Sequence, residues 1–162
     1  DTNQTAGTAL VVGCGLGEDA LFLAELGWNV TAFDIAPTAV EWASKRYPHD
    51  NIRWVVGDLL QPNKEWFLAF DLVLEVHILQ AIPEEFRIPA SRNLSPLVSP
   101  SGQLVCIGRL SEDESVEHNG PPWPLSKDFI SSVGNDLKSI DFTSAQFEGE
   151  ESVRYRAVWR NE

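Results

Sequence analysis

Three glycines separated by single residues carry the clearest chemical meaning in this chain. Gly13, Gly15 and Gly17 follow an apolar run and precede a helix-forming segment, 20–26, and this order predicts a strand, a tight turn and a helix. Glycines suit such a turn because they accept positive φ angles and because a Cβ would hold a ligand away from the backbone N–H groups. We therefore expect a nucleotide-like cofactor to contact the turn, whose residues are Gly13, Cys14, Gly15 and Gly17.

The residue that follows the third glycine separates two classes of cofactor. A dinucleotide-binding turn has the pattern G-x-G-x-x-G, in which the last glycine lets the helix pack closely on the strand. Glu18 occupies that last position. Its carboxylate suits the helix dipole but would repel a pyrophosphate at the same helix end. The sequence therefore disfavours NAD and FAD, and an NAD-dependent oxidoreductase stays open only if Glu18 points away from the cofactor.

The spacing of the three glycines resembles instead the first motif of class I S-adenosylmethionine-dependent methyltransferases, whose cofactor has a sulfonium cation and no phosphate. Many members of this family have an acidic residue two positions before the first glycine, where it contacts the amino group of the cofactor. This chain has Val11 there. Glu18 and Asp19 are the carboxylates that could replace that contact, and we favour Asp19. Glu18 has the alternative role of stabilising the helix N-terminus.

The carboxylate of Asp34 extends the resemblance. Asp34 and Ile35 end the β-rich segment 27–35, and the resemblance implies that Asp34 accepts hydrogen bonds from both ribose hydroxyls of the cofactor. The alternative is that Asp34 is the N-cap of a helix over 39–46, although Thr38 is the better candidate for that role.

Asp58 and Leu59 match the next motif of the family, after a strand-like segment, 52–56. The resemblance implies that Asp58 accepts a hydrogen bond from the adenine amino group, while Leu59 offers its backbone N–H beside it. The alternative is that Asp58 is a turn residue after Gly57. Taken alone Asp58 favours the turn, but together with the glycines and Asp34 it favours the adenine contact.

The segment 70–76 matches the fourth strand of the family and leads into the region where cofactor and acceptor meet. The resemblance therefore places Glu75 at the cofactor. His77 is the one candidate base, because an imidazole titrates near pH 6.5. A base helps a hydroxyl or amine acceptor and matters less for a thiol, whose pKa is about 8.5. The alternative is that His77 is a loop residue packed against the cofactor or a helix.

The segment 119–126 resembles the G-P-P-aromatic-x-x-S sequence of the thiopurine, thiol and halide methyltransferase branch of the family. Its two prolines stiffen the loop and present Trp123 as a wall for an apolar or sulfur-bearing acceptor. The alternative is a rigid turn into a helix over 126–133, with Ser126 as the N-cap.

Strand-like and helix-like segments alternate along most of the chain, which predicts an α/β fold with a parallel sheet and helices on both faces. A helix is expected over 84–98 and a strand over 102–108. The resemblance implies a Rossmann-like three-layer α/β/α sandwich with a mostly parallel seven-stranded sheet and an antiparallel last strand, whose last two strands are 142–148 and 153–160. We expect residues 1–162 to form one S-adenosylmethionine-binding domain, without the helices that usually precede the first strand.

Composition disfavours several other classes of protein. The chain has 162 residues, 43% of them hydrophobic, and no apolar run near the roughly 18 residues of a membrane span. Its net charge of -12, without a basic run, disfavours nucleic acid as a partner. Two cysteines give no disulfide framework, so we expect a cytoplasmic protein. His49, His77 and His118 are too scattered to indicate a metal site.

The sequence therefore predicts a methyltransferase that uses S-adenosylmethionine, releases S-adenosylhomocysteine and needs no metal. Its acceptor is expected to be a small molecule such as a thiol, a halide or another small nucleophile. Methyl transfer is an in-line displacement at a carbon that the sulfonium already activates, so the protein supplies alignment and a dry pocket. The alternative from another class is a non-catalytic module of the same fold that acts as a binding or partner subunit, which Val11 favours.

Overall fold

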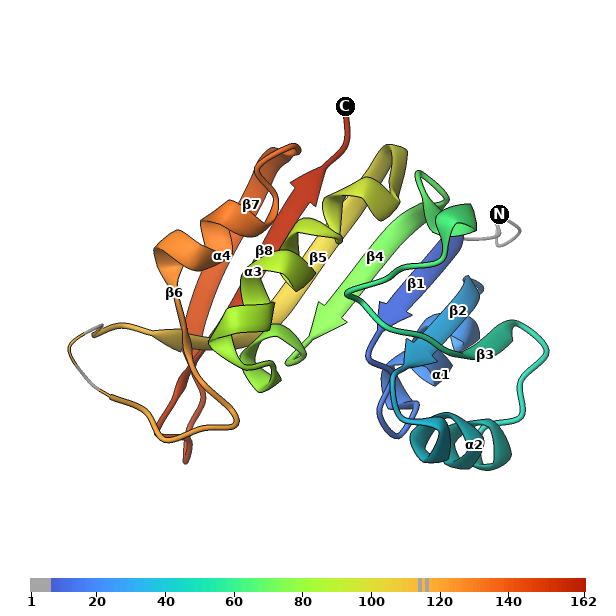
Figure 1. Cartoon of the computed structure of the whole chain (residues 1–162), viewed down its shortest axis with the longest axis horizontal. Helices are drawn as coiled ribbons and strands as arrows, with labels where there is room; N and C mark the ends of the chain where they lie inside the picture. The colour runs from blue at the N-terminus through green and yellow to red at the C-terminus, as the bar shows by residue number, and fades with distance from the viewer. Residues whose placement is uncertain (1–6, 114, 116) are drawn as a thin grey trace.

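A twisted sheet crosses the whole molecule and carries helices on both faces (Figure 1). The computed structural model describes residues 7–113, 115 and 117–162. The strands are β1 (Thr8–Val12), β2 (Asn29–Asp34), β3 (Ile52–Val56), β4 (Phe70–Val76), β5 (Val98–Ser111), β6 (Leu125–Ser126), β7 (Lys138–Gln146) and β8 (Val153–Arg160). The helices are α1 (Glu18–Glu25), α2 (Pro37–Arg46), α3 (Glu84–Arg92) and α4 (Lys127–Val133), with short 3-10 turns η1 (Lys64–Trp66), η2 (Leu79–Ala81) and η3 (Ser95–Leu97).

The strand order is β3-β2-β1-β4-β5-β8-β7, and the two-residue β6 pairs with the end of β5. All pairings from β3 to β5 are parallel, whereas β8 runs antiparallel to both β5 and β7. This confirms the predicted Rossmann-like sheet with an antiparallel last strand, to which β6 adds an eighth. The chain reverses its direction of winding between β1 and β4, and the crevice at the carboxyl ends of such strands is where open α/β sheets bind ligands.

Alternate residues of β1 are buried on opposite faces of the sheet, as expected for a central parallel strand. Leu10 and Val12 pack in one core cluster with residues of α3, α4 and β8. Ala9 and Val11 pack in the other cluster with residues of α1 and α2. Because β1 is clamped between these two cores, the turn that follows it has a fixed position.

The predicted boundaries differ most from the structure around α3, β5 and β7, whereas α1 and α2 begin two residues before their predicted starts. The helix expected over 84–98 ends at Arg92, and a 3-10 turn containing Pro96 follows it. Proline lacks an N–H and disfavours helical geometry in the residue before it, so Pro96 favours an end of the helix before the strand, although α3 accommodates Pro89 within its length. The fifth strand consequently begins at Val98, and β7 covers Lys138–Gln146 rather than 142–148. β8 has the predicted bounds.

Two further expectations concern the ends of elements. The Ser126 side chain accepts a hydrogen bond from the Phe129 N–H at 3.1 Å, which confirms it as the N-cap of α4.

The expectation about helices before the first strand falls on residues 1–6, which lie outside the described residues. Among the residues that the structure describes, no helix has the length and apolarity to cross a membrane.

Candidate functional site

The carboxylate of Asp34 joins the glycine turn to the end of β2. One oxygen, Oδ2, accepts a hydrogen bond from the Gly15 N–H, and Oδ1 accepts one from the Ala36 N–H, each at 3.0 Å. α2 begins at Pro37 with Ala36 as its N-cap and no side-chain cap, so the capping roles considered for Asp34 and Thr38 are wrong. Asp34 instead fixes the geometry of the turn after β1.

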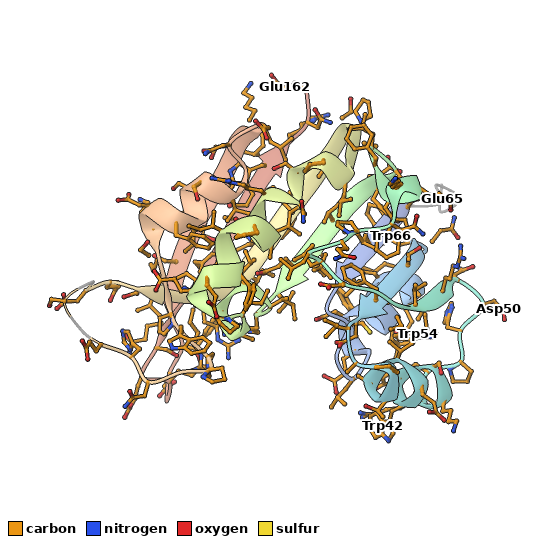
Figure 2. The ribbon with its side chains drawn as sticks, in the orientation of Figure 1. Trp42, Asp50, Trp54, Glu65, Trp66 and Glu162 are labelled. Atoms are coloured by element: carbon orange, nitrogen blue, oxygen red, sulfur yellow. The ribbon has the colours of Figure 1, made fainter. Side chains whose placement is uncertain are left out.

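The three glycines of the turn serve different purposes. All three have positive φ angles. A Cβ added to Gly13 would collide with Ile78, and one added to Gly17 would lie 2.7 Å from the Trp54 ring, whose place beside α2 is visible in Figure 2. A Cβ added to Gly15 would meet no atom within 4 Å. Gly15 therefore faces open space, and a ligand can approach the backbone there.

A cavity of about 320 Å³ opens beside this turn. Such a volume lies within the range of small-molecule sites. Its walls include five of the predicted cofactor-binding residues, which are Gly13, Asp34, Ile35, Asp58 and Leu59. Its other walls come mainly from the loop after β4 and from α3, through Ile78, Ala81, Ile82, Phe86 and Ala90. Ile78, Ala81 and Ile82 belong to the region that the resemblance places where cofactor and acceptor meet. Phe86 and Ala90 were not predicted, because apolar residues of a helix are equally consistent with an ordinary core.

Asp58 has a structural role as well as a place in the cavity wall. Its Oδ1 accepts a hydrogen bond from the Leu60 N–H at 2.9 Å, which confirms the turn considered from the sequence. The same side chain lines the cavity, so its contact with adenine stays a prediction.

The predicted residues Cys14, Gly15, Gly17 and Asp19 belong to the turn and to the start of α1 but do not line the cavity. Burial, together with the nearby Asp34 carboxylate, raises the pKa of the Cys14 thiol to about 11. The thiol is therefore protonated at neutral pH, and any contact of this residue with a ligand is expected through its backbone.

His77 and Asp19 are associated electrostatically. Partial burial raises the pKa of Asp19, Glu18 raises it further, and His77 lowers it in part. His77 has a φ angle of 62° and donates its backbone N–H to the Ile107 carbonyl at 2.9 Å. Its ring Nδ1 is buried and makes no hydrogen bond with the residues that the structure describes. Its role as a base stays a prediction.

Glu75 lies beneath the loop after β4 and is fully buried. Its Oε1 accepts a hydrogen bond from the Leu79 N–H at 3.1 Å, and Oε2 has no partner among the described residues. The pKa of this carboxyl is raised to about 8. Burial is the cause of the rise, and the hydrogen bond from the Leu79 N–H opposes part of it. Glu75 does not line the cavity, and its hydrogen bond to the Leu79 N–H stabilises the start of η2. Its direct contact with the cofactor stays a prediction.

Trp123 lies in the loop before β6, next to α3. Its backbone N–H donates to the Gln80 carbonyl at 2.8 Å, and the guanidinium of Arg87 lies 5.7 Å from the centroid of its ring. The Gln80 side chain, which is also buried, accepts a hydrogen bond from the Arg109 N–H at 2.7 Å. Gln80 and Arg87 were not predicted from the sequence. Their partners are either 29 to 43 residues away along the chain or are backbone carbonyls nearby.

The chain is similar to several known proteins. A family model described as a methyltransferase domain matches residues 9–102, more than half of the chain. Thiocyanate methyltransferase 1 of Brassica oleracea is 28% identical over 148 residues, which are 88% of this chain and 61% of that protein. The tRNA N(3)-methylcytidine methyltransferase trm141 of Schizosaccharomyces pombe is 25% identical over 138 residues, which are 78% of this chain and 56% of that protein. The chain thus spans about three fifths of the length of these curated relatives.

A solved structure shares the fold. The N-methyltransferase NodS from Bradyrhizobium japonicum, in complex with S-adenosylhomocysteine, matches with a TM-score of 0.76 and 21% identity. The match covers 96% of this chain and 78% of that chain.

Substitution of Gly15 should affect ligand affinity more than it affects the stability of the fold. We expect Gly15→Ala to weaken binding of S-adenosylhomocysteine at least about tenfold, because the methyl group enters the open space over the turn, while stability falls by about 1 kcal/mol from the positive φ angle. Gly149→Ala is the matched control: Gly149 also has a positive φ angle and no atom within 4 Å of an added Cβ, but it lies in the turn between β7 and β8, so the affinity should stay unchanged. Calorimetric titration and urea unfolding measure the two effects, and unchanged affinity in Gly15→Ala would contradict the placement of the ligand.

The buried Glu75 predicts a pH-dependent stability. Its pKa is about 8 in the folded protein and 4.5 for an ordinary glutamate, so between these values the folded state keeps a proton that the unfolded state has lost. The free energy of unfolding should therefore fall as pH rises from about 5 to about 8. In Glu75→Gln this contribution is absent, so the decline should be shallower. Urea unfolding at several pH values between 5 and 8 measures the free energy of unfolding of both proteins. An equal decline of this free energy in the wild type and in Glu75→Gln would contradict the raised pKa of Glu75.

Proposed function

The chain belongs to the methyltransferase domain family, and we propose that it transfers a methyl group from S-adenosylmethionine to a small-molecule acceptor. The observation that carries this proposal is the turn at Gly15, which faces open space while Asp34 on the adjacent strand binds its N–H. A bare backbone and a carboxylate at the carboxyl ends of β1 and β2 suit the methionine part and the ribose of this cofactor. The acidic surroundings also suit a sulfonium cation.

Each part of the cofactor has a candidate partner in this chain. Asp34 would accept hydrogen bonds from the ribose hydroxyls with the lone pairs that Gly15 and Ala36 leave free. Asp58 and Leu59 would contact the adenine, since both line the cavity. Asp19 would pair with the methionine ammonium. The bound cofactor supplies an activated methyl group, so the residues of the chain have mainly to align it with the acceptor and exclude water, which is worth up to about 7–11 kcal/mol.

The acceptor is proposed to be a thiol, a halide or a related small nucleophile. Support comes from the thiocyanate methyltransferase of Brassica oleracea and from the Trp123 loop. A thiol ionises in part at neutral pH and needs little help, whereas a hydroxyl or amine would need a base, for which His77 is the candidate. The net charge of -12 disfavours RNA, even though one relative is a tRNA methyltransferase. Two free, buried cysteines favour the cytoplasm as its compartment.

Two observations keep rival functions in view. Val11 is buried in the core, so no acidic side chain contacts the cofactor from that position, which favours a non-catalytic binding or partner module. Glu18 Oε1 lies 3.9 Å from Nη1 of Arg46 on α2, and this cation offsets part of the negative charge that would repel a pyrophosphate, so NAD is the rival ligand. Cofactor preference distinguishes the three functions.

The decisive experiment is calorimetric titration with S-adenosylmethionine, S-adenosylhomocysteine and NAD. We expect binding of the first two and not of NAD. Asp34→Ala should weaken that binding at least about tenfold, because it removes a charge-assisted hydrogen-bond acceptor for the ribose. Asp50→Ala is the control, since Asp50 is exposed at the turn before β3 and does not line the cavity beside the glycine turn. Binding of NAD alone would make the chain an oxidoreductase domain, and binding of none of the three would favour the partner module.

A further inference from the structure

We propose that a groove between α3 and the segment 122–129 holds an anionic, planar end of the methyl acceptor, with Arg87 as the residue that recognises the anion. This inference rests on the proposed function, because it assigns the acceptor side of the same reaction. It goes further in naming a chemical class, a flat molecule that carries a carboxylate or a similar delocalised anion.

The groove and the cofactor cavity lie on two sides of the same helix. The groove has a volume of about 310 Å³, and its walls include Arg87 and Ile88 of α3, Trp123 and Phe129. The cavity beside the glycine turn is lined by other residues of α3, Phe86 and Ala90. Because α3 is a shared wall, an acceptor held in the groove lies next to the loop, 77–82, that faces the cofactor.

Arg87 is held rigidly but is not neutralised. Its Nε donates to the Leu79 carbonyl at 3.1 Å and its Nη2 to the Ile82 carbonyl at 3.0 Å. Its Nη1 makes no hydrogen bond to the described residues. No carboxylate oxygen of those residues lies within 4.0 Å of the Arg87 nitrogens, so Arg87 forms no ion pair with them. By contrast Arg154 pairs with Glu150 through two hydrogen bonds. The Arg87 fork therefore keeps donors free for a ligand.

Partial burial makes this unpaired charge costly. Burial lowers the pKa of the Arg87 guanidinium, and the nearby Glu84 carboxylate offsets this in part. A guanidinium stays charged at neutral pH even so. The hydrogen bonds of Arg87 go to neutral carbonyls, so its charge is not neutralised by a described carboxylate, and an anion in the groove would supply that neutralisation. In a chain with a net charge of -12, a local cation is also needed to overcome the general repulsion of anions.

The remaining walls define the shape of the ligand. Trp123 and Phe129 are flat apolar surfaces, and the Arg87 guanidinium lies over the Trp123 ring. A planar guanidinium binds a carboxylate through two parallel hydrogen bonds, which a point charge such as lysine does not reproduce. The groove thus suits an aromatic or similarly flat body with one carboxylate. Benzoate is the simplest probe of this kind, and benzamide has the same shape without the charge.

The buried turn η2 connects the two sites. Gln80 binds the backbone of Trp123 on one side and that of Arg109 on the other. Arg87 binds the carbonyls of Leu79 and Ile82 from the groove side. The position of the anion relative to the cofactor is therefore set by one short segment rather than by a mobile loop.

The test is a calorimetric titration of the protein saturated with S-adenosylhomocysteine, using benzoate and benzamide in parallel. We expect benzoate to bind at least about tenfold more tightly than benzamide, in line with a charge-assisted pair of hydrogen bonds. Arg87→Lys should reduce this difference and Arg87→Gln should abolish it, because the lysine keeps the charge without the fork and the glutamine has neither. Equal affinities for benzoate and benzamide would overturn the proposal, and so would displacement of benzoate by S-adenosylhomocysteine.

A second pair of variants leaves Arg87 and its hydrogen bonds intact. Glu84 lines the groove and acts on Arg87, whereas its neighbour Glu85 does not line it. Glu84→Gln should therefore tighten benzoate binding about two- to fivefold, and Glu85→Gln should change it less. No tightening in Glu84→Gln, or equal effects of the two substitutions, would contradict the assignment. Failure of S-adenosylhomocysteine to bind in the same titrations would count against the proposed function instead.

Discussion

The parallel pairing of β1 with β2 is the constraint on which the candidate site depends. Its register sets Val12 beside Phe33, so the glycine turn after β1 and Asp34 at the end of β2 emerge side by side. Asp34 then closes the arrangement by accepting the Gly15 N–H, and the open space over Gly15 is left for a ligand. Because β1 is buried on both faces, this geometry is fixed by the core and not by the loop itself.

The segment after β4 divides the carboxyl end of the sheet into two regions. On one side Ile78 and Ile82 complete the cavity beside the glycines, and on the other side Arg87 and Trp123 line the groove. Glu75 holds the start of this segment from below through the Leu79 N–H. Few of these groups are exposed, so the relative position of the two regions follows from buried hydrogen bonds. Such preorganisation is what an in-line displacement requires of a protein.

The sequence predicts those features that depend on local pattern. Alternating strands and helices give the parallel sheet, and the glycine spacing with Asp34 gives the turn and its carboxylate. The end of α3 could not be predicted from the sequence, because the apolar periodicity continues past Arg92 and α3 accommodates Pro89, so a proline alone does not mark where this helix ends. It also could not predict Arg87 or Gln80 as site residues, since their significance comes from contacts with the Trp123 loop. Thr38 was wrongly predicted as a cap because Pro37 already fits the first turn of α2.

The most direct test of the central claim is to follow a labelled methyl group. The protein is incubated with S-adenosylmethionine that carries a ¹³C methyl, together with a panel of thiols, halides and flat carboxylates, and the products are analysed by mass spectrometry. The account predicts one or more labelled acceptors and an equal amount of S-adenosylhomocysteine, with both greatly reduced in Asp34→Ala. Tight binding of the cofactor without any labelled small molecule or S-adenosylhomocysteine would contradict methyl transfer to this class of acceptor.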